Sequence, residues 1–370
     1  MQRHGYQVSV ICPKGKDASA SYELLEGVHI YRHFMPLEAR GAKAYLLEYA
    51  SALFWESWLS LKVFLTRGFD VLQVCNPPDL LFPLGAFYKL LGKCFVFDHH
   101  DISPELYEAK FNRRGLFWKL LVFFEKMTFL TADFSIATNE SYRALAIERG
   151  HMPAERVFVV RNGPSLQRVY PQPPDERWKN SRRFMVAYVG IIAQQEGLDL
   201  LLDTVTYLVR QRGRLDIQFV VVGGGPDQQN VVRMAQDTGL AEYVSFPGRV
   251  DDHTLFTVLS TADLCVNPDR PNVMNDRSTM IKIMEYMAMG KPIVQYDLTE
   301  GRFSAQQASL YARKCDTADF GDKILEILDH PEQARRMSEF GMRRVRETLA
   351  WEHQEKKLLA AYDAIFSHSL

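Results

Sequence analysis

The chain has 370 residues, of which 47% are hydrophobic and 24% are charged, and its formal net charge is −1. This length allows two α/β domains of ordinary size, and the composition excludes a disordered chain. The near-zero net charge provides no positive field that would recruit nucleic acid. Five cysteines without a Cys-x-x-Cys pair argue against a disulfide framework or a zinc site, and no run approaches the roughly 20 apolar residues of a membrane span.

The first half of the chain alternates short runs rich in β-branched residues with longer amphipathic stretches, which predicts βαβ units and parallel strands. The first strand candidate follows only five residues, so the strand and Gly-rich turn that normally open such a domain are missing, and we expect a truncated N-terminus. The opening residues also lack the apolar centre of a signal peptide, which predicts a cytoplasmic protein. The predicted strands are 6–12, 71–74, 94–98, 134–138 and 157–161, and the predicted helices are 43–67, 80–92, 115–131 and 139–149.

A second series of elements follows a stretch with four prolines between Pro164 and Pro174, which indicates a linker. Its predicted strands are 185–189, 218–222, 244–247, 264–267, 292–296 and 308–311, and its predicted helices are 197–211, 227–238, 252–261, 279–289, 317–328, 331–347 and 351–367. The sequence thus predicts a domain over 1–165, a linker over 166–183, a second domain over 184–347, and a C-terminal helix over 348–370 that crosses back to the first domain.

The segment that follows the strand 264–267 carries the densest chemistry. We expect Ser278 or Thr279 to cap the next helix, and Lys282 and Glu285 to share a face away from its apolar stripe. This helix begins at the carboxyl end of a parallel strand, where open α/β sheets bind ligands. A lysine in the first turn opposes the helix dipole unless an anion sits there, which favours a phosphate site. The alternative is a solvated Lys–Glu pair on a surface helix.

Several short motifs together resemble the retaining, GT-B-fold glycosyltransferases of the group 1, family 4-like type, and Asn275-Asp-Arg-Ser-Thr279 is similar to a branch among polysaccharide-biosynthesis enzymes. The resemblance implies an α/β fold of two doubly wound, Rossmann-like domains that face each other across a cleft. It implies transfer of a hexose-type sugar from a nucleotide diphosphate sugar, with retention of the anomeric configuration. The matching motifs are Asp98-His-His-Asp-Ile-Ser-Pro-Glu105, Val160-Arg-Asn-Gly163, Tyr188-Val-Gly-Ile-Ile-Ala-Gln-Gln-Glu-Gly197, Val221-Val-Gly-Gly-Gly-Pro226, Phe246-Pro-Gly-Arg249, Glu285-Tyr-Met-Ala-Met-Gly-Lys-Pro292 and Trp351-Glu.

The same resemblance implies roles for individual residues in donor binding. Glu285 would accept hydrogen bonds from both ribose hydroxyls, a task for which a carboxylate offers acceptors only. The family's other glutamate falls on Arg277, so Asp276 is the nearest substitute for its contact with the donor sugar. The Arg and Lys that clamp the diphosphate in the family are absent from 190–197. The remaining donor-site candidates are the amides of Ser278 and Thr279, Lys282, Gly190, Gly224, Arg249 and Glu300.

His100 and Asp101 follow the predicted strand 94–98 at its ligand-facing end, and the resemblance places a histidine there, facing the donor sugar and the departing phosphate. The alternative is a capping Asp101 beside a structural histidine. No convincing pair of carboxylates supports a protein nucleophile. The resemblance points instead to departure and attack on the same face of the sugar. Without an Asp-x-Asp dyad we expect no metal and no cofactor, with the nucleotide sugar as co-substrate.

Two predicted helical stretches, 45–65 and 110–129, are rich in aromatic residues, and the second also carries basic residues. Their composition suggests what kind of acceptor the protein uses. A basic, aromatic helix suits peripheral contact with the inner face of an anionic membrane and a lipid-linked acceptor, whereas the alternative packs these aromatics on the sheet. The acceptor class is therefore a glycan or a lipid-linked glycan. A second functional alternative is a degenerate, non-catalytic protein that binds a sugar nucleotide or a partner.

Overall fold

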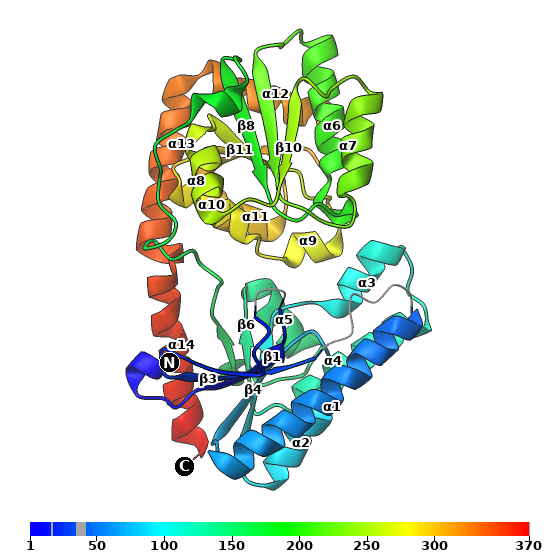
Figure 1. The fold of residues 1–370 in the computed structure, drawn as a ribbon, viewed down its shortest axis with the longest axis vertical. Coiled ribbons are helices and arrows are strands. Elements are labelled where there is room, and N and C mark those ends of the chain that lie inside the picture. The colour runs from blue at the N-terminus through cyan, green and yellow to red at the C-terminus, as the bar shows by residue number, and fades with distance from the viewer. Residues whose placement is uncertain (16–17, 35–41, 370) are drawn as a thin grey trace. The chain divides into compact units, whose positions relative to one another are not determined.

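The computed structural model describes residues 1–15, 18–34 and 42–369, and it divides into two compact units (Figure 1). The first unit consists of Met1–Pro104, Arg114–Val159 and Leu358–Leu370, and the second of Glu105–Arg113 and Val160–Lys357. Each unit has its own parallel sheet. These compact units are defined by contacts within the structure, and a domain is defined by its ability to fold alone. The domain boundaries drawn from the sequence therefore stay predictions.

The second unit is built on a parallel sheet of six strands in the order β10-β9-β8-β11-β12-β13. Written by position in the chain, this order is 3-2-1-4-5-6, which is that of a doubly wound, dinucleotide-binding fold. The strands are β8 (Phe184–Val189), β9 (Ile217–Val222), β10 (Val244–Gly248), β11 (Leu264–Asn267), β12 (Ile293–Tyr296) and β13 (Ser309–Ala312).

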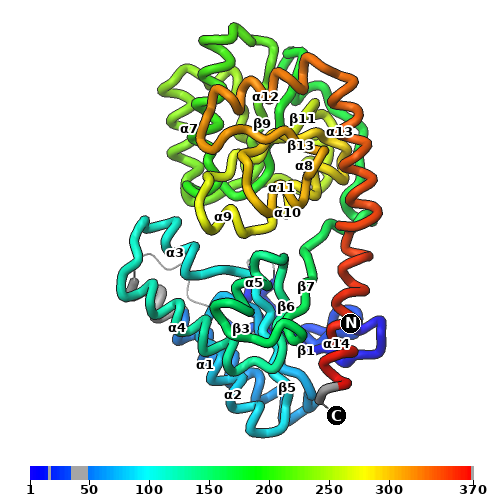
Figure 2. Tube along the Cα trace, turned by 180° about the vertical axis from the view of Figure 1, so that it is seen from behind, coloured from blue at the N-terminus to red at the C-terminus, as the bar shows by residue number. Residues whose placement is uncertain are grey.

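Helices cover both faces of this sheet (Figure 2). Alternate strand residues supply a separate apolar core to each face. In β8, Val186 and Tyr188 pack on one face with α6, α7 and α12, while Met185 and Ala187 pack on the other with α8 and α10. The helices are α6 (Leu198–Thr206) with a π-helical turn η5 (Tyr207–Gln211), α7 (Gln228–Asp237), α8 (Asp252–Thr261), α9 (Val273–Arg277), α10 (Ile281–Ala288), α11 (Thr299–Ala305), α12 (Thr317–Asp329) and α13 (Pro331–Arg344) with a π-helical turn η7 (Val345–Leu349). The last helix, α14 (Trp351–Ser369), belongs to the second unit up to Lys357 and to the first unit from Leu358 onward.

The first unit contains two sheets. A parallel sheet has the order β4-β5-β6-β7, and β5 is buried along its whole length. The other sheet has the order β1-β3-β2, with β1 parallel and β2 antiparallel to β3. The strands are β1 (Ser9–Pro13), β2 (Tyr22–Leu25), β3 (Val28–His33), β4 (Val71–Cys75), β5 (Cys94–His99), β6 (Phe134–Ala137) and β7 (Val157–Val159), and the helices are α1 (Ala42–Thr66), α2 (Phe82–Leu90), α4 (Leu116–Thr131) and α5 (Glu140–Glu148). α3 (Ser103–Phe111) follows β5 in the chain, but from Glu105 onward it belongs to the second unit.

The structure differs from the sequence prediction mainly where elements are short. β2 and β3 form a hairpin that was not predicted, and the predicted strand 6–12 begins at Ser9. α3, α9 and α11 were also not predicted, whereas the helix predicted over 279–289 is present as α10. Short elements offer too few residues for a clear period, so periodicity alone does not separate them from loops.

The proline-rich stretch 166–183 is fastened to the second unit. The amide of Gln172 donates to Ser260 Oγ and the amide of Asp175 to Thr261 Oγ1, both at 2.8 Å. Trp178 packs against the core on the α8 and α10 face. All five cysteines are described, and each is a free thiol. Among the described helices, none is both long and apolar enough to cross a membrane.

Candidate functional site

The strand order of the second unit reverses between β8 and β11, so their C-terminal ends form a topological switch point. The connection from β8 leads to one half of the sheet and that from β11 to the other, and open α/β sheets bind ligands at such a point. Glycines let the loops there pack closely: a Cβ on Gly223 would lie 1.8 Å from the Gly190 carbonyl oxygen, and one on Gly197 would lie 2.1 Å from that of Pro268. The loops after β8, β9 and β11 therefore form one tightly packed layer of backbone.

Lys282, in the first turn of α10, places its amino group against the loops after β8 and β11. Its Nζ donates to Glu196 Oε2 and to Asp269 Oδ1, both at 2.9 Å, and lies 4.7 Å from the centre of the Tyr188 ring. The side chain is only 10% exposed. Burial by itself would lower the pKa of Lys282, but Asp269, Tyr188 and Glu196 outweigh burial and raise that pKa well above its usual value.

This arrangement corrects one prediction about the helix. Lys282 does not lie on a solvated face with Glu285, so the alternative of a surface Lys–Glu pair is wrong. A lysine at a helix N-terminus is repelled by the helix dipole unless an anion lies nearby. Here two carboxylates of the protein provide that negative charge. The negative charge of this cluster exceeds its positive charge, and burial raises the pKa of Asp269. Binding of a diphosphate by Lys282 stays a prediction.

The predicted cap of α10 is wrong. The segment before it forms α9, which is capped by Asn272, whose side chain accepts from the amide of Asn275 at 2.9 Å. Ser278 follows the end of α9, and its hydroxyl donates back to a carbonyl of that helix at 2.7 Å. Within the described residues α10 has no side-chain cap. The Asn-x-x-Asn pattern starts a helix nearly two turns earlier than Ser278 or Thr279 would.

Asp276 and Glu300, two candidates for contact with the donor sugar, both make contacts around α11. The carboxylate of Asp276 accepts from the Thr299 amide at 3.0 Å and from its hydroxyl at 2.9 Å. Glu300 is buried and accepts from Arg161 Nη1 at 3.0 Å, and Arg161 also donates to Thr279 Oγ1 at 3.2 Å. In this structure both carboxylates thus hold the N-terminal end of α11 in place.

Glu285 lines a pocket of about 410 Å³ that lies wholly within the second unit. Its walls come from 162–169, from α8, from the exposed side of α10 and from Trp351. Gly163 is required in this wall, because a Cβ there would lie 1.9 Å from the carbonyl oxygen of Leu349. The volume is within the range of small-molecule sites, and apolar walls with a few polar groups are typical of them.

The charges in this pocket are those of two carboxylates and one guanidinium. Burial raises the pKa of Glu285, Arg168 lowers it in part, and Asp252 raises it further. Arg168 and Asp252 form an exposed ion pair at 2.8 Å on the rim. Carboxylates accept but do not donate when ionised, so the pocket is suited to hydroxyl and N–H groups rather than to phosphate.

Gly190, Gly224 and Arg249 lie at the ends of β8, β9 and β10. The carbonyl of Gly224 accepts from the Ile192 amide at 3.2 Å, which ties the loops after β8 and β9 together. Arg249 is exposed, and its stem lies beside Gly224, where an added Cβ would meet it at 3.3 Å. The structure therefore groups these three candidates along one edge of the sheet.

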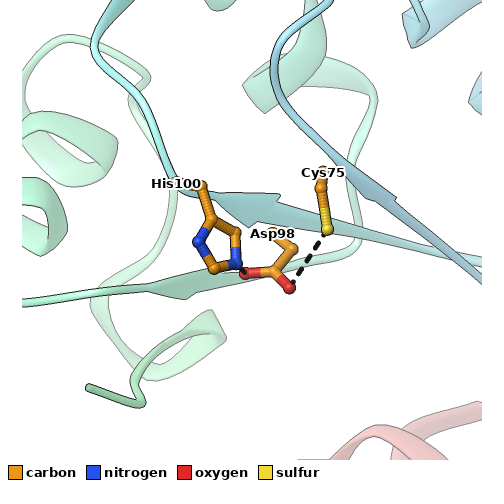
Figure 3. A group of neighbouring side chains, drawn as sticks. All are labelled: Cys75, Asp98 and His100. Atoms are coloured by element: carbon orange, nitrogen blue, oxygen red, sulfur yellow. Dashed lines mark hydrogen bonds and ion pairs between the residues drawn. The ribbon is translucent and has the colours of Figure 1, made fainter. Parts of the chain in front are cut away.

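In the first unit, His100 follows the end of β5 and contacts Asp98, as Figure 3 shows. The imidazole Nε2 lies 3.0 Å from Asp98 Oδ1, while Cys75 at the end of β4 donates its thiol to Asp98 Oδ2 at 3.4 Å. The hydrogen bond to Asp98 raises the pKa of His100 although burial opposes it. The histidine is therefore held protonated to higher pH than an isolated imidazole.

Asn76 fixes the turn that carries His100 and Asp101. Its Oδ1 accepts from the amides of His100 at 2.9 Å and Asp101 at 3.1 Å. Its Nδ2 donates to the carbonyl of Asp101 at 2.6 Å and to Asp79 Oδ1 at 2.9 Å. One buried amide thus joins the ends of β4 and β5 and sets the backbone on which both candidate catalytic residues stand.

Within the described part of the chain, one group has the composition of a metal site. Cys75, Asp98 and His100 each offer one ligand atom, and these atoms lie within 4.8 Å of one another. The Asp98 carboxylate already accepts from both other residues and from Gln73 Nε2 at 2.5 Å, and burial raises the pKa of the Cys75 thiol to about 12. Hydrogen bonds from the neighbouring side chains therefore already occupy the oxygens of Asp98.

The sequence indicated the main candidate residues, Lys282 and His100, but not the side chains that contact and position them. Glu196 and Asp269 are separated by 73 positions, and nothing in their spacing links them to Lys282. Asn76 stands in an Asn-Pro-Pro-Asp stretch directly after a strand, a signal that would have drawn attention to it. Arg161 stands in the motif Val160-Arg-Asn-Gly163, but the motif gave it no role, because its contacts are with distant parts of the chain.

Two family models match this chain and together account for most of its length. The model described as Glycosyltransferase Family 4 matches residues 1–168, and the model described as Glycosyl transferases group 1 matches residues 183–330. The chain belongs to the group 1 glycosyltransferases of the family 4 type.

Several characterised proteins are similar to this chain. An alpha-D-kanosaminyltransferase of Streptomyces kanamyceticus is 29% identical over 44% of the chain and 41% of its own length. The mannosylfructose-phosphate synthase of Agrobacterium fabrum is 25% identical over 70% of the chain and 58% of its own length. The chain thus spans about half the length of these relatives. A phosphatidyl-myo-inositol mannosyltransferase of Mycobacterium leprae is 23% identical over 99% of the chain and 90% of its own length.

Solved structures show that the fold is GT-B. A sucrose-phosphate synthase of Thermosynechococcus elongatus superimposes with a TM-score of 0.82 at 19% identity, covering 99% of this chain and 91% of that one. The lipopolysaccharide glycosyltransferase WaaG gives 0.68 at 13% identity, over 97% and 91% of the two chains. Anabaena Alr3699/HepE, in complex with UDP and glucose, gives 0.69 at 14% identity, over 91% and 86%. The predicted fold class is therefore confirmed.

Proposed function

We propose that this protein transfers a hexose-type sugar from a nucleoside diphosphate sugar to a glycan or lipid-linked acceptor. The observation that carries the proposal is the position of Glu285, half-buried in a pocket that would hold a nucleoside. Family membership supports the reaction class, and the structural neighbour bound to UDP supports a diphosphate donor. The Glu285 carboxylate would accept hydrogen bonds from the two ribose hydroxyls.

The diphosphate would then lie where the loops after β8 and β9 meet the start of α10. Glycine-rich backbone and a helix N-terminus both present N–H groups to an anion. Lys282 at the start of this helix is paired with Glu196 and Asp269. Its charge would serve the diphosphate when one of these carboxylates is protonated, and burial raises the pKa of Asp269 in that direction. In this arrangement the protein stabilises the charge that develops on the departing diphosphate.

We further propose transfer with retention of configuration and without a metal ion. The bond between the anomeric carbon and the diphosphate breaks, and the acceptor oxygen bonds to that carbon on the same face. The acceptor proton passes to an oxygen of the leaving diphosphate, so no protein nucleophile is required. His100, protonated through its contact with Asp98, would donate a hydrogen bond to the sugar or to the leaving phosphate.

The role of Glu285 is tested by Glu285→Gln, which removes the charge but keeps the size. Loss of a charge-assisted hydrogen bond costs about 1.5–3 kcal/mol, so we expect UDP or GDP to bind about 10- to 100-fold more weakly. Isothermal titration calorimetry measures the change. The matched control is Glu347→Gln, which alters an exposed glutamate on η7 of the same unit and should leave nucleotide binding unchanged.

The same experiment has a pH arm. Because burial raises the pKa of Glu285, the carboxylate becomes protonated at a higher pH than an exposed glutamate does. Nucleotide affinity of the wild type should therefore fall as the pH is lowered through that raised pKa, while the affinity of Glu285→Gln should stay low and change little. Equal affinity of wild type and variant at neutral pH would refute the proposed nucleoside pocket.

A further inference from the structure

A second pocket, in the first unit, has a chemistry that the donor site does not use. It measures about 280 Å³ and lies between the end of β3 and the second half of α1. β3 contributes Arg32 and His33, and α1 contributes Trp55 and Lys62. Lys14, after β1, adds a third cation. Every residue that lines this pocket belongs to the first unit.

Two buried nitrogens in this pocket lack a partner. Arg32 Nη1 and His33 Nε2 are shielded from solvent and make no hydrogen bond within the structure that is described. Arg32 is held from the other side, because its Nη2 donates to Glu23 Oε2 at 2.7 Å. Leaving a buried donor unpaired costs free energy that a bound acceptor would recover. The pocket therefore contains unused hydrogen-bonding capacity at its most buried residues.

The tautomer of His33 limits what it would bind. His33 is 2% exposed, and its Nδ1 lies 3.0 Å from the carbonyl oxygen of Phe34. Because a carbonyl only accepts, Nδ1 carries the proton, and Nε2 of the neutral ring is left as an acceptor. A hydroxyl group is the natural partner of that atom. The Trp55 ring stacks on the imidazole at an angle of 13° and fixes its orientation.

The charge of the pocket is positive. Lys14, Arg32 and Lys62 line it, and among the described residues that do so there is no carboxylate. This concentration of cations stands out in a chain whose formal net charge is −1. Glu23, which does not line the pocket, is paired with Arg32, so the excess positive charge comes from Lys14 and Lys62. Two lysines beside a buried guanidinium favour an anion such as phosphate or carboxylate.

We infer that this pocket binds the acceptor through an anionic group, a phosphate or a carboxylate, carried on a hydroxylated sugar or polyol. Arg32, Lys14 and Lys62 bind the anion, and His33 Nε2 accepts from a hydroxyl. The volume is near the lower limit for ligand pockets and suits a single substituted ring rather than a nucleotide sugar. This inference rests on the proposed transferase function, because it assigns the pocket to the acceptor of that reaction.

The test measures binding of four probes to the full chain by ligand-observed NMR: glucose, glucose 6-phosphate, glucuronate and inorganic phosphate. We expect glucose 6-phosphate or glucuronate to bind at least about tenfold more tightly than glucose, which corresponds to the loss of one charge-assisted contact in the neutral sugar. The comparison of these two probes identifies the anion. Inorganic phosphate should bind more weakly than the preferred sugar acid, because it offers no ring hydroxyl to His33.

Arg32→Gln and Lys62→Gln should each remove most of this preference, and Lys126→Gln, which neutralises an exposed lysine of α4 in the same unit, should not. Lys62 is exposed, so its variant tests the pocket even if Arg32→Gln fails to fold. The inference is overturned if glucose binds as well as the sugar acids, or if a folded Lys62→Gln retains the full preference. UDP binding is measured on the same samples: its absence from the wild type would contradict the proposed function, whereas normal UDP binding without sugar-acid binding would contradict this inference alone.

Discussion

At the scale of single residues, the protein keeps its most buried charges in small groups of opposite sign. Lys282 lies between Glu196 and Asp269, and Arg161 lies against Glu300 with both side chains about 4% exposed. A buried ion pair adds little net stability when it is intact, but removal of one member leaves an uncompensated charge in a medium of low polarity. These ion pairs therefore hold the loops and helices that carry them in defined positions, and they add little to the free energy of unfolding.

The Lys282 group allows a sharp prediction. Lys282→Met keeps the apolar stem but leaves two buried carboxylates without a cation, and we expect it to lower the free energy of unfolding by about 3–5 kcal/mol. Urea unfolding at neutral pH measures the loss. Addition of Asp269→Asn and Glu196→Gln should restore much of the stability, because the triple variant buries no unpaired charge.

The pH dependence of Lys282→Met has a definite sign. Without the lysine, burial raises the folded-state pKa of Asp269 further above its unfolded value, so the folded state binds a proton more readily than the unfolded state does. The penalty is therefore greatest above the folded-state pKa and is relieved as the pH falls through it. A stability difference from wild type that did not shrink on acidification would contradict this account of the group.

At the scale of elements, close approach of backbones determines where the loops lie. Gly163 sits against η7, the turn that precedes α14, and the amide of Trp351 donates to the carbonyl of Pro164 at 3.0 Å. The chain segment that walls the Glu285 pocket is thereby attached to the C-terminal helical region. Neither contact is visible in the local sequence, because the partners are almost 190 positions apart in the chain.

Gly163→Ala should therefore be costly even though alanine is only one methyl larger. The added Cβ would have to displace a carbonyl from 1.9 Å, and overpacking of this kind costs about 1–3 kcal/mol. Gly115→Ala is the control, because a Cβ there meets nothing within 4 Å. Thermal unfolding followed by circular dichroism compares the two variants. We also expect Gly163→Ala to weaken nucleotide binding, since displacement of this segment widens the pocket.

At the scale of the whole molecule, the first unit exposes apolar side chains next to cations. Phe54, Trp58 and Phe123 are each more than half exposed, and Leu116 is 85% exposed. Packing on the sheet therefore accounts for only some of the aromatic residues in these helices. α4 buries Leu121 and Phe129, but a second apolar face of the same helix is exposed to solvent. Such a surface beside Arg114 and Lys119 is suited to an anionic membrane.

The membrane contact is a prediction for the full chain. The double variant Arg114→Glu, Lys119→Glu should reduce co-sedimentation with vesicles rich in phosphatidylglycerol, because each basic residue near an anionic surface contributes about 1 kcal/mol. The control Arg233→Glu, Arg343→Glu changes the net charge equally on exposed sites of the second unit. Equal sedimentation of both variants with wild type would rule out α4 as the membrane-binding surface.

The α/β class, the parallel strands and the candidates Glu285, His100 and Lys282 follow from the amino-acid sequence alone, because hydrophobic period and short motifs are local properties of the chain. Long strands such as β5, and helices such as α8, were placed to within about a residue for the same reason. The three-dimensional fold was needed to show that Lys282 is buried between Glu196 and Asp269, that α10 follows a separate short helix capped by Asn272, and that Arg32 and His33 meet α1. These facts depend on contacts between residues far apart in the chain, and such contacts form only when the sheets bring the ends of separate strands and helices together.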